Sequence, residues 1–377
     1  MKIGITGQSG FVGTHLYNTI GLFPEKYVRV EFKDEFFSDK ALLRAFVKQC
    51  DVIVHLAAMN RHNDPDVLYR TNIDLVKKLI NACEATKSTP HILFSSSTQE
   101  ERDNLYGRSK KEGRQLFGKW AEKNNGRFSG LIIPNVFGPF GHPYYNSVVA
   151  TFCHQLTHGE TPQIQVDGEL KLIYVGELVQ LILDLIDTEA SQKDTMFVNE
   201  VEVKHSTVAK VSTILQILTE FKDKYFIKGE IPNLENPMVK YLFNTFVCYI
   251  DHKSFYPFYL KLNSDNRGSF VETIKLNSGG QVSFSTTAPG ITRGNHFHTR
   301  KAERFAVIKG KARIDLRRIG TNEVLSFELD GSKPSFVDMP IWYTHNITNI
   351  GEEELYTLFW INEHFDPNDT DTYFEKV

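Results

Sequence analysis

Residues 3–13 read IGITGQSGFVG, an apolar run that leads into Gly7, Gly10 and Gly13. Glycine at these three positions permits a tight turn, a close approach of the backbone to a ligand, and close packing of the next helix on the strand. The free N–H groups at the start of a helix bind phosphate. The stretch therefore predicts a strand, a turn and a helix that hold the pyrophosphate of a dinucleotide.

Apolar runs alternate with amphipathic stretches over roughly the first 135 residues, which favours parallel strands joined by crossover helices. The runs are KIGIT (2–6), YVRVEF (27–32), VIVHLAA (52–58), HILFSSS (91–97) and GLIIPNVFG (130–138). From 136 to about 250 the pattern is mostly helical, with SVVATFCHQL, GELVQLILDLI and STVAKVSTILQILTEF around one strand, KLIYV. We expect a doubly wound, Rossmann-like α/β sheet with a helical substrate lobe.

The texture changes after Asp251, where short alternating runs are separated by glycine or polar turns. The runs are GSFVETIKL, GQVSFST, ERFAVIKG, KARIDLRRI, EVLSFELD, SFVDMP and LYTLFWI. This pattern is typical of an all-β sandwich or barrel. Two domains are expected for a chain of 377 residues, one over 1–250 and one over 251–377.

Composition excludes several classes of protein. A net charge of −3 disfavours nucleic acid and anionic membranes as partners. No run reaches the roughly 18 apolar residues of a membrane span, and the N-terminus lacks the pattern of a signal peptide. The four cysteines lie far apart without a CxxC pair, as expected of reduced thiols. We expect a soluble, cytoplasmic protein.

A tyrosine and a lysine in YGRSK (106–110) share one face of a predicted helix. A cation near a phenol stabilises the phenolate, so Tyr106 beside Lys110 would serve as a proton donor or acceptor. Together with the glycine turn, HLAA, FSSS and NVFGP (135–139), the motif resembles the extended short-chain dehydrogenase/reductases (SDRs), which act largely on nucleotide sugars. Thr98 and Gln99 replace the Asp-Glu pair of the 4,6-dehydratases in that family, which favours hydride transfer over dehydration.

The resemblance implies roles for individual residues. Tyr106 is the catalytic acid or base, Lys110 binds the nicotinamide ribose and lowers the tyrosine pKa, and Ser97 bonds the reacting oxygen. Asn135 is expected to bind substrate. The cofactor set is Gly7, Gly10, Phe11, Val12, Gly13, Lys33, Leu56, Ala57, Ala58, Tyr106 and Lys110. The segment EFKDE (31–35) offers a carboxylate for NAD and a cation for NADP, and Lys33 favours NADPH.

A second constellation lies in residues 290–310, GITRGNHFHTRKAERFAVIKG. Its spacing of glycine, HxH, Glu303 and glycine, followed by His345 in PIWYTHNITN, resembles the two motifs of the metal-binding cupin barrels, with Trp342 in place of a glycine. The resemblance implies that His296, His298, Glu303 and His345 bind one ion. Three imidazoles and a carboxylate suit Zn, Fe, Mn or Ni, and Zn²⁺ is the expected metal.

Residues 265–272, DNRGSFVE, resemble the opening of the dTDP-4-keto-sugar 3,5-epimerases. That likeness implies that Arg267 and Glu272 bind the nucleotide end of a substrate and that His296 matches the catalytic base. A metal-bound imidazole cannot act as a free base. The ion is therefore either structural, or a Lewis acid that polarises the C4 ketone. Tyr343 and His364 are the other acid/base candidates.

At the scale of the whole chain, this order of domains resembles the bifunctional capsule and O-antigen enzymes of the CapF/WbjC type in the UDP-N-acetyl-L-fucosamine pathway. The likeness implies C3 epimerisation of UDP-2-acetamido-2,6-dideoxy-4-keto-hexose by the barrel, NADPH reduction at C4 to UDP-2-acetamido-2,6-dideoxy-L-talose, and a homodimer. Two alternatives stay open. The barrel is a non-catalytic, metal-stabilised module for folding or dimerisation beside a working reductase, or the chain is a nucleotide-sensing regulatory protein.

Overall fold

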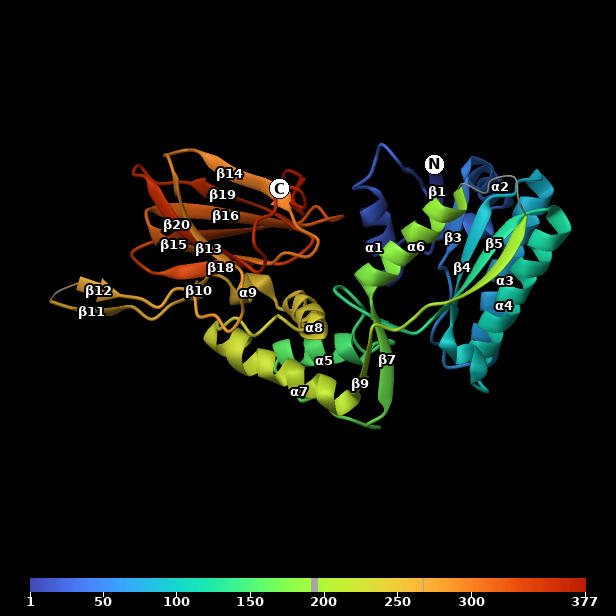
Figure 1. Ribbon diagram of the computed structural model, residues 1–377, viewed down its shortest axis with the longest axis horizontal. Helices are drawn as coiled ribbons and strands as arrows, with labels where there is room; N and C mark the ends of the chain where they lie inside the picture. Colours follow the sequence, from blue (N-terminus) through green and yellow to red (C-terminus); the bar gives the residue numbers. More distant parts are fainter. Residues whose placement is uncertain (191–195, 267) are drawn as a thin grey trace. The chain divides into compact units, whose positions relative to one another are not determined.

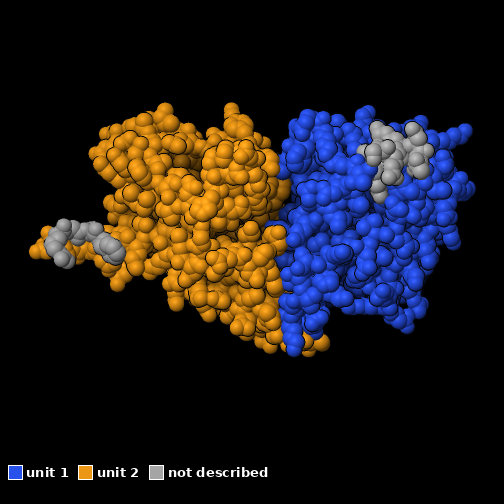
Figure 2. All heavy atoms as spheres, viewed as in Figure 1, with its two compact units in different colours: residues 1–137, 141–148, 168–210 blue, residues 138–140, 149–167, 211–377 orange. Residues whose placement is uncertain are grey.

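The computed structural model describes residues 1–190, 196–266 and 268–377, and the chain divides into two compact units (Figure 2). Unit 1 consists of Met1–Phe137, Gly141–Val148 and Gly168–Lys210. Unit 2 consists of Gly138–Phe140, Val149–Asp167 and Val211–Val377. Within the described part of the chain, no helix has both the length and the apolar character needed to cross a membrane.

Unit 1 is built on a six-stranded parallel sheet in the order β2-β1-β3-β4-β5-β8. Its strands are β1 (Lys2–Thr6), β2 (Val28–Val30), β3 (Val52–His55), β4 (His91–Ser97), β5 (Arg127–Ile133) and β8 (Phe197–Glu202). The order reverses direction between β1 and β3, where ligands bind in doubly wound sheets. The predicted α/β fold is confirmed.

Helices cover both faces of this sheet (Figure 1). They are α1 (Phe11–Ile20), α2 (Lys40–Gln49), α3 (Pro65–Thr86), α4 (Leu105–Asn124) and α6 (Val175–Ala190), with 3₁₀ turns η1 (Asp34–Ser38) and η2 (Thr98–Glu101). Helix α3 begins where it does because Asp64 accepts hydrogen bonds from two backbone N–H groups and Pro65 occupies the first turn. It ends at Lys87 in the left-handed conformation.

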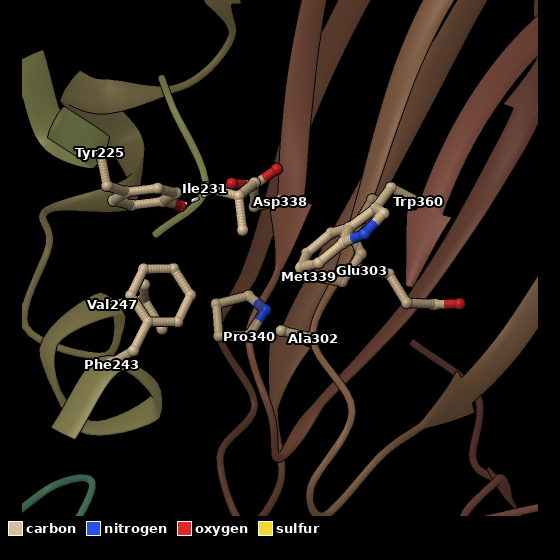
Figure 3. A pocket seen from close by; sticks show the side chains of 10 residues that line it. All are labelled: Tyr225, Ile231, Phe243, Val247, Ala302, Glu303, Asp338, Met339, Pro340 and Trp360. Atoms are coloured by element: carbon tan, nitrogen blue, oxygen red, sulfur yellow. Dashed lines mark hydrogen bonds between the residues drawn. The ribbon is translucent and has the colours of Figure 1, made fainter. Parts of the chain in front are cut away.

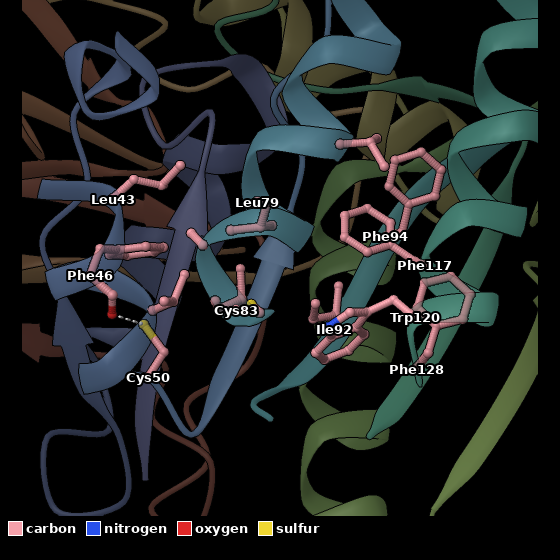
Figure 4. Close-up of a cluster of buried hydrophobic side chains, with 14 of the residues drawn as sticks. Leu43, Phe46, Cys50, Leu79, Cys83, Ile92, Phe94, Phe117, Trp120 and Phe128 are labelled. Atoms are coloured by element: carbon pink, nitrogen blue, oxygen red, sulfur yellow. Dashed lines mark hydrogen bonds between the residues drawn. The ribbon is translucent and has the colours of Figure 1, made fainter. Parts of the chain in front are cut away.

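The core of unit 1 lies between the sheet and helices α2, α3 and α4 (Figure 4). Aromatic side chains dominate it: Phe117 stacks on Phe128 with ring centroids 5.8 Å apart, and Trp120 is 3 % exposed. Burial of such rings contributes several kcal/mol each. This rigid block fixes the carboxyl ends of β1, β3 and β4, from which the first candidate site is built.

A second sheet of unit 1 has three strands, β6 (Asn135–Phe137), β7 (Glu169–Tyr174) and β9 (Thr207–Lys210). The sequence pattern predicted one helix over 206–221, which is wrong for its first turn. Residues 207–210 pair antiparallel with β7, and the helix α7 begins only at Val211. The β-branched Thr207 and Val208 suit a strand, and pairing with β7 decides between the two conformations.

Unit 2 contains two five-stranded sheets, β10-β18-β15-β20-β13 and β17-β16-β19-β14-β21, and a hairpin of β11 and β12. The strands are β10 (Phe258–Tyr259), β11 (Asn263–Asp265), β12 (Gly268–Phe270), β13 (Gln281–Thr287), β14 (Thr292–Phe297), β15 (Glu303–Lys309), β16 (Lys311–Arg318), β17 (Val324–Asp330), β18 (Ser335–Met339), β19 (Tyr343–Asn349), β20 (Leu355–Ile361) and β21 (Tyr373–Phe374). Their buried apolar side chains form one core. The predicted all-β barrel is confirmed, but the predicted strand 268–276 is only Gly268–Phe270.

Helices also belong to unit 2. They are α5 (Val148–Thr157), whose first residue lies in unit 1, α7 (Val211–Phe221), a π-helical turn η3 (Lys222–Phe226), α8 (Pro237–Val247) and α9 (His252–Phe255). Tyr225 of the π-turn donates a hydrogen bond to Asp338 of β18 at 2.5 Å. Such contacts group residues 211–250 with the barrel by packing. The predicted domain boundary between 250 and 251 stays a prediction.

Candidate active site and metal centre

The glycine turn of unit 1 has the backbone form that its sequence predicts. Gly7 has φ +72°, and a Cβ there would lie 2.8 Å from the Ala57 nitrogen. A Cβ on Gly13 would lie 2.2 Å from the Gly7 oxygen, so only glycine allows α1 to approach this closely. Helix α1 begins after Gly10 without a side-chain cap and without an acidic residue in its first turn. Its free N–H groups can therefore hold a phosphate.

The loop after β3 lies against this turn. Leu56 donates its N–H to the Thr6 oxygen at 3.1 Å, and the Ala57 N–H approaches the Thr6 hydroxyl at 3.4 Å. Asn72 of α3 exchanges hydrogen bonds with the backbone of Met59 and donates one to Ser109 of α4. Asn72 therefore ties the loop to the helix that carries Tyr106, a role that the sequence analysis missed.

Tyr106 and Lys110 lie on α4, and Lys110 is 3 % exposed. Its ammonium donates to the Ser95 oxygen at 2.9 Å and lies 5.7 Å from the centre of the Tyr106 ring. Burial lowers the pKa of Lys110 to about 8, against a smaller opposing effect of Glu100. Burial first and then Tyr145 raise the pKa of Tyr106 to about 12, so the lowering expected from Lys110 is absent here. The phenol is neutral at pH 7 and can donate a proton.

Three other residues of unit 1 were predicted to belong to the site, namely Ser97, Lys33 and Asn135. The Ser97 hydroxyl accepts from the Gln99 N–H at 3.2 Å and caps η2. Lys33 lies beyond the end of β2 in an exposed ion pair with Glu31 at 3.3 Å. Both signs of charge are therefore present where the ribose of a dinucleotide binds in such sheets. Asn135 opens β6, and its amide donates to the Lys171 oxygen.

The four predicted metal ligands of unit 2 converge. Their ligand atoms all lie within 4.8 Å of one another. His296 of β14 and His345 of β19 are paired in one sheet, Glu303 begins β15 of the other sheet, and His298 follows β14. The ligands therefore come from both sheets of the barrel.

The chemistry of these four groups fits a cation. His298 Nε2 and His345 Nε2 lie 3.3 and 3.0 Å from one oxygen of Glu303, yet these buried atoms make no well-aligned hydrogen bond among the described residues. The other ring nitrogen of each histidine faces a backbone oxygen, which can only accept, so it carries the proton. Lone pairs of nitrogen and oxygen then face each other. A divalent ion with bonds of about 2.0–2.2 Å would bind all of them.

Electrostatics agree with this reading for Glu303 and His296, but not for His298: burial lowers the pKa of His298, and the Glu303 carboxylate outweighs that effect and raises it. Burial alone would raise the pKa of Glu303, but the adjacent His298 and His345 lower it well below its usual range, so the carboxylate keeps its charge. Burial first and then His345 lower the pKa of His296 to about 4. A neutral imidazole and an ionised carboxylate are the forms that bind metals.

Trp342 replaces a glycine of the second motif without displacing His345. Its φ is +62°, a conformation that glycine adopts freely and a bulky side chain rarely does. The strain is offset by burial, since Trp342 is 8 % exposed and stacks on Phe297 with centroids 5.6 Å apart. His345 therefore keeps its place among the four ligands although tryptophan stands where the motif has glycine. Asn295, at φ +60°, forms a bulge in β14 just before His296.

The remaining predicted residues of unit 2 lie elsewhere or are not described. Arg267 falls outside the described residues. Glu272 is exposed and forms an ion pair with Lys275 at 3.0 Å. Tyr343 packs against His252 and Phe140, and burial raises its pKa. His364 is exposed. The structure therefore gives Tyr343 a packing role.

A small pocket lies next to Glu303, on the side opposite its carboxyl group (Figure 3). Apolar side chains of the helical segment, Phe243 and Val247 among them, line it together with Met339 and Trp360 of the barrel. The Glu303 carboxyl points away from Tyr225 and Phe243 in this view. The pocket is thus a packing gap behind the ligand strand rather than part of the metal cluster.

Two family models match parts of the chain, and one relative matches nearly all of it. A model described as the NAD dependent epimerase/dehydratase family matches residues 3–198, and one described as the polysaccharide biosynthesis C-terminal domain matches 263–373. The chain is 32 % identical to a UDP-2-acetamido-2,6-beta-L-arabino-hexul-4-ose reductase of Pseudomonas aeruginosa, over 99 % of this chain and 98 % of the relative.

Two solved structures resemble this chain, one over its full length and one over its N-terminal part. The capsular polysaccharide assembling protein CapF of Staphylococcus aureus has a TM-score of 0.62 at 35 % identity and covers 100 % of both chains. UDP-glucose 4-epimerase of Thermotoga maritima has a TM-score of 0.51 at 20 % identity, over 59 % of this chain and 83 % of that one. The second likeness concerns the fold alone.

Proposed function

Because this chain belongs to the NAD dependent epimerase/dehydratase family and, over its full length, to the capsular polysaccharide proteins of the CapF type, we propose that it is a bifunctional enzyme of UDP-sugar synthesis. The barrel epimerises C3 of UDP-2-acetamido-2,6-dideoxy-4-keto-hexose. Unit 1 then reduces the C4 ketone to give UDP-2-acetamido-2,6-dideoxy-L-talose, on the way to UDP-N-acetyl-L-fucosamine for capsule or O-antigen.

The observation that carries the reductase step is the Tyr106 and Lys110 pair beside a dinucleotide turn. A bound reduced nicotinamide supplies the hydride for C4. Tyr106, which is neutral at pH 7, donates its proton to the C4 oxygen as that oxygen gains negative charge. Lys110 adds positive charge near the phenol and would bond the ribose of the cofactor. Lys33 favours NADPH over NADH, because a cation beyond β2 suits a 2′-phosphate.

Support for the epimerase step comes from the cluster of His296, His298, Glu303 and His345. A divalent ion, Zn²⁺ by this donor set, would stabilise negative charge on the C4 oxygen while a base takes up the C3 proton and the enolate is then protonated on its opposite face. His296 is then a ligand rather than the base. Glu272 and Arg267 are proposed to bind the nucleotide end of the substrate, and a homodimer in the cytoplasm is expected from the resemblance.

The reductase step is tested by replacing Tyr106 with phenylalanine. With the UDP-4-keto sugar and NADPH, the Tyr106→Phe protein should oxidise the cofactor about 100- to 10,000-fold more slowly than the native chain. Tyr259→Phe is the matched control, since that tyrosine is 65 % exposed on unit 2. If Tyr106→Phe keeps the native rate of NADPH oxidation, the assigned proton donor is wrong. If the native chain oxidises no NADPH, the reductase proposal fails as a whole.

One rival keeps the reductase but denies chemistry to the barrel. In it, the metal cluster only stabilises unit 2, consistent with ligands drawn from both of its sheets. The two proposals differ in one outcome, exchange of the C3 proton in the absence of NADPH.

A further inference from the structure

The last residues of the chain lie along the strand that carries the first metal ligands. Residues 369–377, here called the C-terminal strap, include β21, which pairs antiparallel with β14 through His296↔Phe374 and Phe297↔Tyr373. The Glu375 N–H donates to the Asn295 oxygen at 3.0 Å, and Arg317 donates to the Lys376 oxygen at 2.6 Å. The strap therefore reaches the metal cluster from a part of the chain that contributes no ligand.

Asp371 lies at the centre of the strap. It is 4 % exposed and has φ +44°, a left-handed conformation that aspartate tolerates better than most residues. Its backbone oxygen lies 2.5 Å from His298 Nδ1. A carbonyl oxygen only accepts, so this contact places the proton on Nδ1 and leaves the Nε2 lone pair directed at the other ligands.

The Asp371 carboxylate holds the turn between two ligands. Its oxygens accept from three consecutive backbone N–H groups, those of Thr299, Arg300 and Lys301, at 3.0–3.2 Å. The Thr299 hydroxyl adds a bond of 2.6 Å. Consecutive N–H groups that converge on one anion form a nest. This turn joins His298 to Glu303, so the carboxylate sets the spacing of these ligands in space.

The buried Lys301 gives the strap a second attachment at the same turn. Lys301 is 2 % exposed, and its ammonium donates to the Thr370 oxygen at 2.9 Å. By contrast, Asp369 meets only the exposed rim, where its carboxylate pairs with Arg300 at 2.6 Å and is 64 % exposed. The two aspartates thus differ in burial and in whether their carboxylates bind the backbone of the ligand turn.

We propose that Asp371 is the positioning residue of the metal centre, acting through the tautomer of His298 and the backbone of residues 299–301. This inference rests on the proposed metal site. Groups that orient metal-bound histidines typically change metal affinity by about 10- to 100-fold when they are removed.

The test measures Zn²⁺ affinity of the full-length protein by competition with a chromogenic chelator. The native chain should bind one Zn²⁺. Asp371→Ala keeps the backbone oxygen against His298 but lacks the carboxylate that holds residues 299–301, so it should bind the ion about 10- to 100-fold more weakly, and Asp371→Asn should fall between them. Asp369→Asn, which removes the same charge from the strap, should match the native affinity. In the Co²⁺-loaded protein, Asp371→Ala should also shift the visible absorption bands, which report ligand geometry and not overall stability.

The outcomes distinguish a failure of the proposed metal site from a failure of the role of Asp371. If the native chain binds no Zn²⁺, the metal site itself is wrong. If the native chain binds Zn²⁺ and Asp371→Ala binds it equally well with an unchanged Co²⁺ spectrum, the metal site stands and the role of Asp371 is overturned. Should Asp371→Ala fail to fold, Asp371→Asn decides in the same way. Native affinity with a native spectrum overturns the role, and weaker binding supports it.

Discussion

Burial determines whether Lys110 of the Tyr106 and Lys110 pair carries its positive charge, and this effect can be tested by varying the pH. Its pKa is lowered to about 8, so the lysine loses its proton in the folded protein before it would in the unfolded chain. Buried charge on Lys110 therefore costs stability below pH 8, and that cost is relieved as the pH rises towards the ordinary pKa of 10.5. Activity runs the other way, because the cation assists Tyr106.

We expect the rate of NADPH oxidation to fall above about pH 8 in the native chain. In Lys110→Arg, the guanidinium stays charged, so the pH profile should lose this descending limb even if the maximal rate is lower. The measurement is kcat against pH for both proteins. An identical descending limb in Lys110→Arg would show that another group titrates.

Trp342 sets backbone strain against burial. Left-handed geometry costs a bulky residue about 1–2 kcal/mol, whereas truncating a buried aromatic ring costs about 3–5 kcal/mol. The loss of the buried ring outweighs the relief of backbone strain. Trp342→Gly should therefore lower the free energy of unfolding of unit 2 by roughly 2–3 kcal/mol, although glycine is the usual residue there. Trp342→Phe should lose less, since it keeps an aromatic ring beside Phe297. Urea unfolding measures both, and a glycine variant more stable than the native chain would contradict this balance.

At the scale of elements, strand β15 joins the metal cluster to the helical segment of unit 2. Glu303 points toward the other ligands. The next residue, Arg304, points to the opposite face of the strand, where it is also buried. Arg304 is 1 % exposed and forms a two-pronged ion pair with Asp338 of β18 at 2.7 and 2.9 Å, plus a bond to the Gly229 oxygen at 2.6 Å. Tyr225 of the π-turn completes the network.

Arg304→Met should destabilise unit 2 by about 3–5 kcal/mol, because it leaves the Asp338 carboxylate buried without a cation. Lys253→Met provides the matched control. Lys253 pairs with Glu323 at 2.5 Å, but both side chains are more than half exposed, so its loss should leave the stability of unit 2 nearly unchanged. Chemical unfolding compares the two variants. Equal effects would mean that the Arg304 pair contributes no more than a surface contact.

Local spacing explains which elements and residues the sequence could predict. The glycine turn and the Tyr106 and Lys110 pair each lie within a short motif, so strand and helix geometry brings their members together. The set of four metal ligands, in which His345 lies 42 positions beyond Glu303, was predicted through the resemblance to the cupin motifs. Asp371 escaped prediction because it meets His298 across 73 positions of sequence. Strand β9 escaped because its pairing with β7, for example Leu172↔Thr207 across 35 positions of sequence, outweighs local helical periodicity.

At the scale of the molecule, one functional group connects the two proposed activities. A ketone at C4 acidifies the hydrogen on C3 and is also what a hydride reduces, so an epimerase and a reductase can share one 4-keto sugar. The full-length match to capsular polysaccharide proteins shows that the two parts occur together on one chain elsewhere. The central claim is that the barrel performs chemistry of its own.

The most direct test is proton NMR of UDP-2-acetamido-2,6-dideoxy-4-keto-hexose in heavy water with Zn²⁺-loaded protein and no NADPH. The C3 proton signal should disappear faster than in an enzyme-free blank, and equally fast with Tyr106→Phe, whose defect is confined to reduction. Persistence of the C3 proton at the blank rate, in protein that still oxidises NADPH once it is added, would contradict the account and leave a reductase with a structural barrel.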